Sequence, residues 1–478
     1  MLRINMQLCT ACIAVFATLF YVSGCSYADN SGMNADSTKA AASENAKKGV
    51  KDITSSFSLA WYQQCVSENV KQNLVLSPLS AYRMLGTLYQ GSAGETQNQI
   101  RSAMQWDGDL PTWQTAMRES ADVWNSLKEM TLADGVWIQD NYKINADFIQ
   151  TLWRTASVEV KNTNFGSENA RTEVNKWVAA KTEGKIPELL DSLSEDTQIL
   201  MANTLVFQGR WAHAFDERDS RKGYFTSIDG DEYRYPMMQT ESEFRYYQGE
   251  DYQWLEMPYE GKKFSLMVLL PKDRGLFMEQ EKNLTPEFVE KCRKEAKRTK
   301  VDVRFPKFTM RCTHQLIPSL TKMGVQDAFQ AVANFSPMTE SDDVMVTQIR
   351  QGIFLKVNEE GTEAAAATAV EFYPKAMNDG TPKFYADRPF VFMIRENTTG
   401  AILFVGRFVD PEGMEEATEI SQEDRAQMVS GGTAETVNEE SNSVEGKKPE
   451  VESNGTPEKE ETTSETDFNT SGVGGSME

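Results

Sequence analysis

The sequence predicts one large α+β domain between residues 51 and 411 of the 478-residue chain. Hydrophobic residues make up 40% of the chain and charged residues 25%, which is the composition of a globular protein. Helical and strand patterns interleave through this range without a repeat or a domain break. The net charge of −22 is uneven, because residues 412–478 hold 18 acidic and 4 basic residues and leave only −8 for the rest. The acidity therefore belongs to the C-terminal segment and not to the predicted domain.

The first 24 residues have the features of an export signal. Arg3 precedes an apolar run from Leu8 to Val22, which suits a signal peptide and is shorter than the ~20 residues that cross a bilayer. The small residues that end at Cys25 resemble the cleavage box of bacterial lipoproteins, in which this cysteine becomes the lipidated N-terminus. We expect a lipoprotein signal peptide at 1–24 and a lipid on Cys25, with plain secretion and cleavage nearby as the alternative.

A lipid on Cys25 would anchor the exported protein to the bacterial cell envelope without further membrane contact. Ser26 favours the outer membrane, on either its periplasmic or its surface face. Residues 25–50 are rich in Ser, Ala, Asn and Lys, so we expect a flexible tether. Residues 412–478 contain one aromatic residue and little aliphatic periodicity, so they predict an acidic disordered tail. Whether that tail only solvates the protein or also binds a partner stays open.

The residue content argues against the common enzyme and nucleic-acid-binding classes. The chain has two histidines, His213 and His314, and no HExxH, GxSxG, P-loop or paired CxxC motif. We therefore expect no metal, no cofactor and no catalytic triad. The negative net charge argues against a general electrostatic affinity for the phosphates of DNA or RNA.

The cysteines that remain after Cys25 do not form a disulfide framework. They are Cys65, Cys292 and Cys312, and three thiols are too few to hold together an exported domain of this size. A single bridge between Cys292 and Cys312 stays open. Burial of apolar surface is therefore expected to stabilise the fold.

Apolar spacing predicts the main elements of the domain. Helical spacing occurs at residues 53–65, Leu79–Tyr89 and Glu173–Thr182. Residues Asn73–Ser77 predict a short strand that runs into the second of these helices, with Pro78 in its first turn. Apolar runs predict strands at Thr204–Phe207, at Phe264–Leu270, which Pro271 ends, and at Ala401–Gly406.

The segment Val357–Glu371 allows two conformations. Its alanines favour a helix on propensity alone. Read with period 2, it places one set of small residues on one face and the charged residues on the other. The small set is Thr362, Ala364, Ala366, Thr368 and Val370; the opposite set is Glu363, Ala365, Ala367, Ala369 and Glu371. Gly361 supplies a backbone pivot just before the run, so the segment could be a loop or helix in one state and an inserted strand in another.

The same segment resembles the hinge of the serpin family. The matching residues are Asn358-Glu359-Glu360-Gly361-Thr362-Glu363-Ala364-Ala365-Ala366. Eight further blocks that are similar to the family stand in family order: Asn73–Ser80, Gly91–Thr96, Asn203–Trp211, Leu255–Tyr259, Pro306–Phe308, Met323–Phe329, Pro389–Phe392 and Phe404–Pro411. The resemblance covers residues 51–411, so this range is identified as a serpin domain.

The resemblance implies a fold of three β-sheets, eight or nine helices and an exposed reactive-centre loop after the hinge. In the family, a serine or cysteine protease attacks this loop and forms an acyl-enzyme. The cleaved loop then inserts into the central sheet and deforms the protease before deacylation. The chain itself would catalyse nothing, and its partner would be the trapped protease, with the serpin a monomer.

The resemblance also assigns roles to individual residues. The hinge comprises Glu359, Glu360, Gly361, Thr362, Glu363, Ala364, Ala365, Ala366 and Ala367. Counting from Gly361 places the bait bond at Lys375–Ala376, which favours a trypsin-like protease because its S1 pocket holds a carboxylate. Tyr373 or Met377, read by other proteases, remains the alternative.

Two further residue sets match places where the family's central sheet opens. The "shutter" set is Ser77, Ser80, Asn203 and Gln351, and the "breach" set is Trp211, Lys307 and Glu359, with an ion pair expected between Lys307 and Glu359. The family usually has a histidine where this chain has Gln351, so we expect a hydrogen-bonded shutter without a titrating member.

Three functions follow from these observations. The first is an inhibitory serpin tethered to the envelope, and small residues after Gly361 favour it. The second is a non-inhibitory binding or carrier protein on the same scaffold. The third, an envelope hydrolase, finds no nucleophile–base motif to support it.

Overall fold

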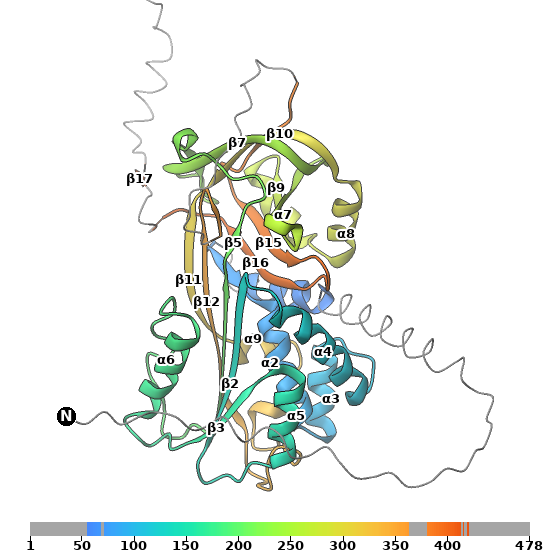
Figure 1. The fold of residues 1–478 in the computed structure, drawn as a ribbon, viewed down its shortest axis with the longest axis vertical. Coiled ribbons are helices and arrows are strands. Elements are labelled where there is room, and N and C mark those ends of the chain that lie inside the picture. Colours follow the sequence, from blue (N-terminus) through green and yellow to red (C-terminus); the bar gives the residue numbers. More distant parts are fainter. Residues whose placement is uncertain (1–54, 68–70, 363–379, 413, 415–417, 420–478) are drawn as a thin grey trace, which may run out of the picture. The chain divides into compact units, whose positions relative to one another are not determined.

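The computed structural model describes residues 55–67, 71–362, 380–412, 414 and 418–419, which form two β-sheets with helices around them (Figure 1). Several predictions lie outside the described residues. These are the signal peptide, Cys25, the tether, the tail from residue 420, and residues 363–379, which include most of the hinge and the bond Lys375–Ala376.

A seven-stranded sheet forms the centre of the molecule. Its strands run in the order β3-β2-β4-β12-β13-β5, and β11 pairs with the other edge of β12. The pair β4–β12 is parallel, whereas β2–β4 and β11–β12 are antiparallel. The bounds are β2 Met130–Gln139, β3 Glu159–Thr163, β4 Ile199–Phe207, β5 Gly209–Arg210, β11 Phe308–Gln315, β12 Val346–Val357 and β13 Gly361–Thr362.

The second sheet has ten strands and makes the upper half of the fold (Figure 1). Its order is β1-β16-β15-β9-β8-β7-β10-β14, and β6 and β17 also pair with β7. The third sheet that the resemblance implies is continuous with this one, because the 17-residue strand β7 pairs first with β6 and β10 and then with β8. The bounds are β1 Leu74–Leu76, β6 Arg221–Thr226, β7 Glu232–Gln248, β8 Tyr252–Pro258, β9 Phe264–Pro271, β10 Lys297–Pro306, β14 Lys383–Tyr385, β15 Phe390–Glu396, β16 Ile402–Phe408 and β17 Thr418–Glu419.

Nine α-helices occur in the described part of the chain, in agreement with the expected eight or nine. The first covers residues 55–66. The others are α2 Pro78–Gly91, α3 Gly94–Ala103, α4 Leu110–Asn125, α5 Ala146–Ala156, α6 Ala170–Lys181, α7 Phe277–Lys282, α8 Pro286–Glu295 and α9 Ile317–Lys322. The strands and helices predicted from apolar spacing are therefore confirmed, with ends that move by a few residues.

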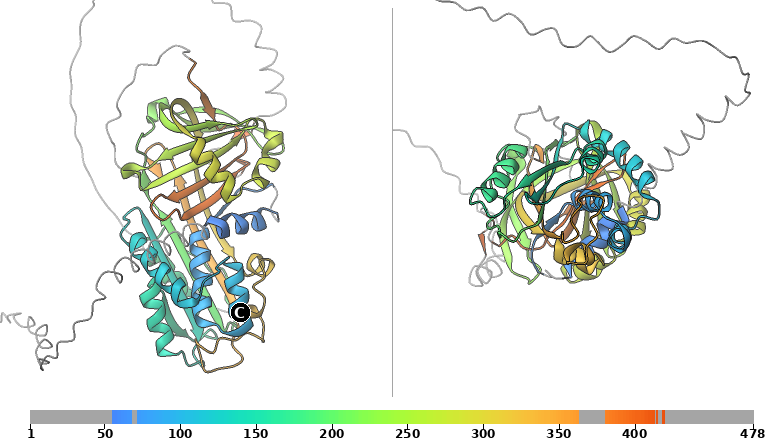
Figure 2. Two further views of the ribbon diagram at one scale, coloured as in Figure 1. Left: turned by 90° about the vertical axis from the view of Figure 1, so that its right-hand side faces the viewer. Right: turned by 90° about the horizontal axis from the view of Figure 1, so that it is seen from below.

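Helix α2 lies between the two sheets, because it contacts both β4 and β16 (Figure 2). All of its residues are buried. Its start follows from local chemistry: Ser77 has extended backbone angles and its hydroxyl accepts from Ser80 N, and Pro78 occupies the first turn as predicted. The N-terminus of α2 lies against β12, because Ser77 N donates to Gln351 Oε1 at 3.0 Å, and Arg83 further along the helix binds Asp134 of β2.

Helix α6 covers the other face of the central sheet (Figure 1). Trp177 and Val178 of α6 pack in one apolar cluster with Trp137 of β2, Ala202 of β4 and Phe354 of β12. The two faces of the sheet thus have separate cores, and any new strand between β4 and β12 would run beneath this helix.

None of the three described cysteines forms a disulfide, so the bridge that the sequence left open between Cys292 and Cys312 is absent from the structure. Cys292 lies on α8 against Tyr252, whereas Cys312 lies on β11 beside Val75. Burial raises the pKa of both thiols to about 11, which keeps them protonated and unreactive near neutral pH. Among the described residues, no helix is long and apolar enough to cross a membrane.

Candidate functional site

The three breach residues meet at the upper end of the central sheet. Lys307 Nζ lies 3.0 Å from Glu359 Oε1, as expected. Trp211 donates from its backbone N to Glu360 O and from its indole Nε1 to Asn358 O, both at 2.9 Å. The tryptophan therefore holds the chain just before Gly361 at both its backbone and its side chain.

Glu359 is the electrostatic centre of this end. Its side chain is buried, and Ser220 Oγ donates to its carboxylate at 2.6 Å. Burial opposes ionisation, but the hydrogen bonds from Ser220 and Lys307 outweigh it and hold the pKa of Glu359 below its ordinary value. The sequence did not indicate Ser220, because it lies 139 residues away along the chain.

The first two residues after the breach form a short strand between two others. In β13, Thr362 lies opposite Val357 of β12 and Gly209 of β5, and both pairings are antiparallel. A Cβ on Gly361, whose φ is +153°, would lie 2.0 Å from Gly209 O. The close approach of the two backbones therefore requires glycine at position 361. The part of Val357–Glu371 that the structure describes, up to Thr362, is strand and bend, and the helix alternative for residues 363–371 is outside the described residues.

Thr362 is held on the inner face of the sheet. Its hydroxyl shares a 2.7 Å hydrogen bond with Tyr259 Oη, and both side chains are buried. Tyr259 stacks on Trp211, with ring centroids 4.5 Å apart. The stacked rings of Trp211 and Tyr259 therefore pack beneath β13 on the inner face of the sheet.

Three of the four shutter residues bond to one another below the middle of the sheet. Gln351 Oε1 accepts from Ser77 N at 3.0 Å, and Gln351 Nε2 donates to Ser77 O at 2.9 Å. Ser77 Oγ donates to Ser80 Oγ at 2.8 Å. Gln351 therefore ties strand β12 to the N-terminus of α2.

Asn203 belongs to a separate group. Its Nδ2 donates to Asp134 Oδ1, and Arg83 of α2 binds the other carboxylate oxygen at 2.6–2.7 Å. Asn203 Oδ1 is buried, and within the described part of the chain it has no hydrogen-bond partner. Sequence reasoning missed Asp134 and Arg83. Arg83 is the only charged residue in the sequence of α2, and this was the available signal, because a charge on a buried helix needs a buried partner.

The two groups form one polar row across four strands. Asp134 lies opposite Asn203, Asn203 opposite Gln351, and Gln351 opposite His314, so β2, β4, β12 and β11 each contribute one residue. His314 hydrogen-bonds Val75 O at 2.8 Å. Burial lowers the pKa of His314, and the bond to Val75 offsets only part of this. A titratable residue thus lies beside Gln351, and only strand register could have placed it there.

The site consists of strand ends and buried polar side chains of the central sheet. Among the described residues, no group of three or more His, Cys, Asp or Glu side chains could hold a metal ion. Strand β13 already pairs with both β12 and β5, above the point where β4 and β12 pair directly. An antiparallel strand that continued β13 downward would have to separate β4 from β12.

Comparisons with known proteins agree with this geometry. The model of a family described as "Serpin (serine protease inhibitor)" matches residues 52–411. An uncharacterized serpin-like protein of Thermococcus kodakarensis is 31% identical over 380 residues, which cover 77% of this chain and 87% of that protein. Leukocyte elastase inhibitor of Equus caballus is 34% identical over 357 residues, or 71% of this chain and 93% of that protein. The structure of human thyroxine-binding globulin in complex with thyroxine matches with a TM-score of 0.71 and 26% identity, over 77% of this chain and 99% of that one.

Proposed function

Because the chain belongs to the serpin family, we propose that it inhibits a protease by inserting its own cleaved loop between β4 and β12. Members of this family are generally not enzymes, and the protein would be consumed in a single turnover. The observation that carries the proposal is β13, which already pairs with β12 and β5 just above the residues where β4 and β12 pair with each other. Insertion would replace one parallel pairing with two antiparallel ones, and the antiparallel arrangement is slightly the more stable per residue.

The register of β13 fixes where each loop residue would go. With Thr362 opposite Val357 and Gly209, each further residue moves one position down both neighbouring strands. Glu363 would then lie opposite the exposed Lys356, on the outer face of the sheet. An opposite-charge pair across two strands stabilises a sheet by about 0.2–1 kcal/mol.

The same count places Thr368 between Asn203 and Gln351. These two residues are opposite each other in the present sheet, so both neighbouring strands give the same answer. A threonine hydroxyl there could donate to Asn203 Oδ1, which is buried and lacks a partner within the described residues. Satisfying such a group recovers about 1–3 kcal/mol of desolvation, so the inserted state gains a bond that the present state lacks.

The register also supports the position of the bait bond. Val346, the first residue of β12, would lie opposite residue 373, and Ile199, the first residue of β4, opposite residue 372. Cleavage at Lys375–Ala376 would therefore release a strand long enough to run between β4 and β12 over their whole paired length and to end two residues beyond Val346. A cut at Met377 would add slack between the sheet and the protease. Lys375 before the cut favours a trypsin-like serine protease, and cysteine proteases are the second target class.

The experiment is to incubate the full chain with trypsin-like, chymotrypsin-like and cysteine proteases and to run denaturing gels. We expect a boiling-resistant band at the summed mass with a trypsin-like enzyme, and a released fragment that begins at Ala376. Cleavage by every protease without an adduct would refute inhibition. If such cleavage also left thermal stability unchanged, a non-inhibitory carrier would be the better description, as the similarity to thyroxine-binding globulin allows.

We further propose that the protein is an exported monomer held at a bacterial envelope by a lipid on Cys25. The sequence features behind this are the apolar run before Cys25, the tether at 25–50 and the acidic tail at 412–478, which flank the serpin domain at 51–411. Mass spectrometry of the N-terminal peptide should find a lipidated Cys25. A Cys25→Ser variant that stayed in the membrane fraction would contradict this proposal.

A further inference from the structure

A basic surface lies beside the point where the loop returns to the fold. Residues 291–300, which end α8 and begin β10, hold six basic residues and one acidic residue in a chain whose net charge is −22. Lys291, Lys294 and Lys297 are exposed. The question is which of these charges are already compensated by the fold.

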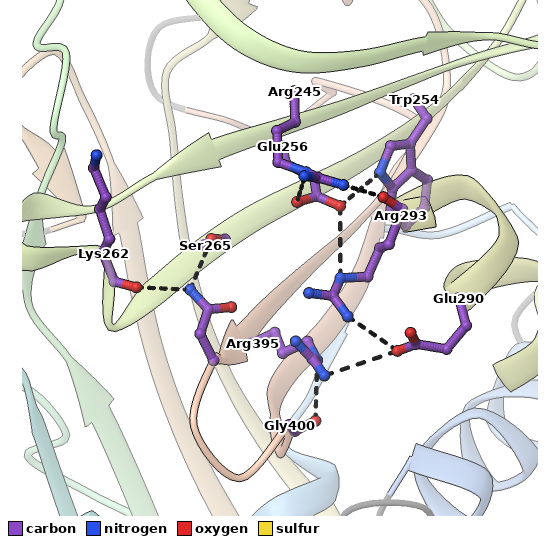
Figure 3. Close-up of polar contacts among 10 residues, drawn as sticks. Arg245, Trp254, Glu256, Lys262, Ser265, Glu290, Arg293, Arg395 and Gly400 are labelled. Carbon is purple, nitrogen blue, oxygen red and sulfur yellow. Dashed lines mark hydrogen bonds and ion pairs between the residues drawn. The ribbon is translucent and has the colours of Figure 1, made fainter. Parts of the chain in front are cut away.

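Three of the six are compensated by carboxylates. Figure 3 shows Arg293 between Glu256 and Glu290, at 3.5 Å and 3.0 Å. On β10, Arg298 pairs with Glu243 at 3.3 Å and Lys300 with Glu241 at 2.5 Å. By contrast, no described carboxylate lies within ion-pair distance of Lys291, Lys294 or Lys297. These three define what we call the lysine surface.

Strand pairing places the lysine surface next to the returning loop. Strands β10 and β14 are parallel, with Asp302 opposite Lys383, and Asp302 N donates to Pro382 O at 2.9 Å. The start of β10 therefore extends toward the side from which residues 380–382 arrive. The bond Lys375–Ala376 lies at most ~18 Å of extended chain before Gly380.

The size of a protease brings it over this surface. A protease domain of roughly 220 residues has a radius of gyration of about 17 Å. An enzyme bound at Lys375 would therefore extend past Gly380 and over neighbouring parts of the fold. Charges within about 10 Å of its surface act on it at physiological salt.

We propose that the lysine surface, formed by Lys291, Lys294 and Lys297, attracts target proteases whose surface beside the active site is acidic. This inference rests on the proposed function and adds the chemistry of the partner. A lipid partner fits less well, because the large apolar side chains that are exposed among the described residues lie elsewhere, at Ile149, Trp153, Tyr224 and Val332. Charge on a surface of this kind raises the rate of association more than it strengthens the final complex.

The test compares anionic and cationic trypsin, which share a preference for lysine but differ in surface charge. The full chain and a Lys291→Gln/Lys294→Gln/Lys297→Gln variant are measured for the rate of adduct formation at low and high salt. With anionic trypsin, the variant should react about 10-fold more slowly at low salt, and the difference should vanish near 1 M salt. With cationic trypsin, the variant should react as fast as the wild type or faster.

The matched control replaces Lys128, Lys143 and Lys176 with glutamine, which removes the same formal charge from exposed positions on either side of β2 and on α6. It should change the rate with anionic trypsin by less than the lysine-surface variant does. Equal rates for the two variants would overturn the inference while leaving inhibition intact. If wild-type protein forms no adduct at all, the proposed function itself fails. If the lysine-surface variant inhibits normally but no longer binds dextran sulfate, the surface serves a polyanion and the inference is wrong.

Discussion

Removing Asp134 should destabilise the native state strongly, because it leaves Arg83 without its counter-charge. Both side chains are almost fully buried, at 4% and 1% exposed. The Asp134 carboxylate accepts from Arg83 on one oxygen and from Asn203 on the other. After Asp134→Ala, Arg83 would keep only its bond to Ala156 O, at 2.6 Å. Breaking a buried pair of this kind costs about 3–5 kcal/mol.

The assay is denaturant unfolding of the single variants Asp134→Ala and Arg83→Met and of the double variant Arg83→Met/Asp134→Leu. The double variant should recover most of the lost stability, since replacing both charges with apolar groups is often neutral or stabilising. A control, Lys143→Ala, breaks the exposed pair with Glu340 and should cost under about 1 kcal/mol. If Asp134→Ala also costs less than about 1 kcal/mol, the reasoning about the buried pair is refuted.

Three further predictions concern β13 and the polar row of the central sheet. Thr362→Arg would bury an unpaired guanidinium opposite Val357 at a cost of several kcal/mol, so adduct formation should fall more than ~100-fold while cleavage continues. The control Thr362→Ser keeps the hydrogen bond to Tyr259 and should inhibit normally. A normal adduct yield for Thr362→Arg would contradict the idea. Gly361→Ala should displace β13 from between β12 and β5, because the new Cβ would lie 2.0 Å from Gly209 O. Trp211 donates to Asn358 O just before this strand, so its fluorescence should change. An unchanged spectrum would argue against the close approach of the two backbones. Burial lowers the pKa of His314, so the unfolded chain binds more protons than the native protein as pH falls below about 6.5. The free energy of unfolding should therefore drop as pH falls through that range, and His314→Gln should flatten this dependence. An equal slope in both proteins would exclude His314 as its source.

The sequence was informative where chemistry is local or where the family resemblance named the residue. The strand at Phe264–Pro271 is buried throughout, as its apolar run predicts. Ser77 and Pro78 start α2 as their residue types suggest. The resemblance named all three breach residues, and the structure brings them together, with the predicted ion pair between Lys307 and Glu359.

Sequence reasoning failed where strand register decides the outcome. Asp134 and Asn203 are 69 residues apart, and nothing near either residue indicates that they share a hydrogen bond. His314 comes beside Gln351 only because β11 pairs with β12 in one particular register. A one-residue slip would turn His314 to the other face, so no local pattern could have identified it.

The polar row explains how β4 and β12 can be both well packed and separable. Asn203 and Gln351 lie opposite each other, yet each bonds away from the other: Gln351 to the backbone of Ser77, and Asn203 to Asp134. Within the described residues, only backbone hydrogen bonds therefore join β4 to β12 at Asn203 and Gln351. Under the proposed mechanism, parting the strands would break no side-chain bond in the row. The backbone bonds that are lost would be replaced on both edges of the inserted strand, so the sheet would open against a transient cost and close with a net gain.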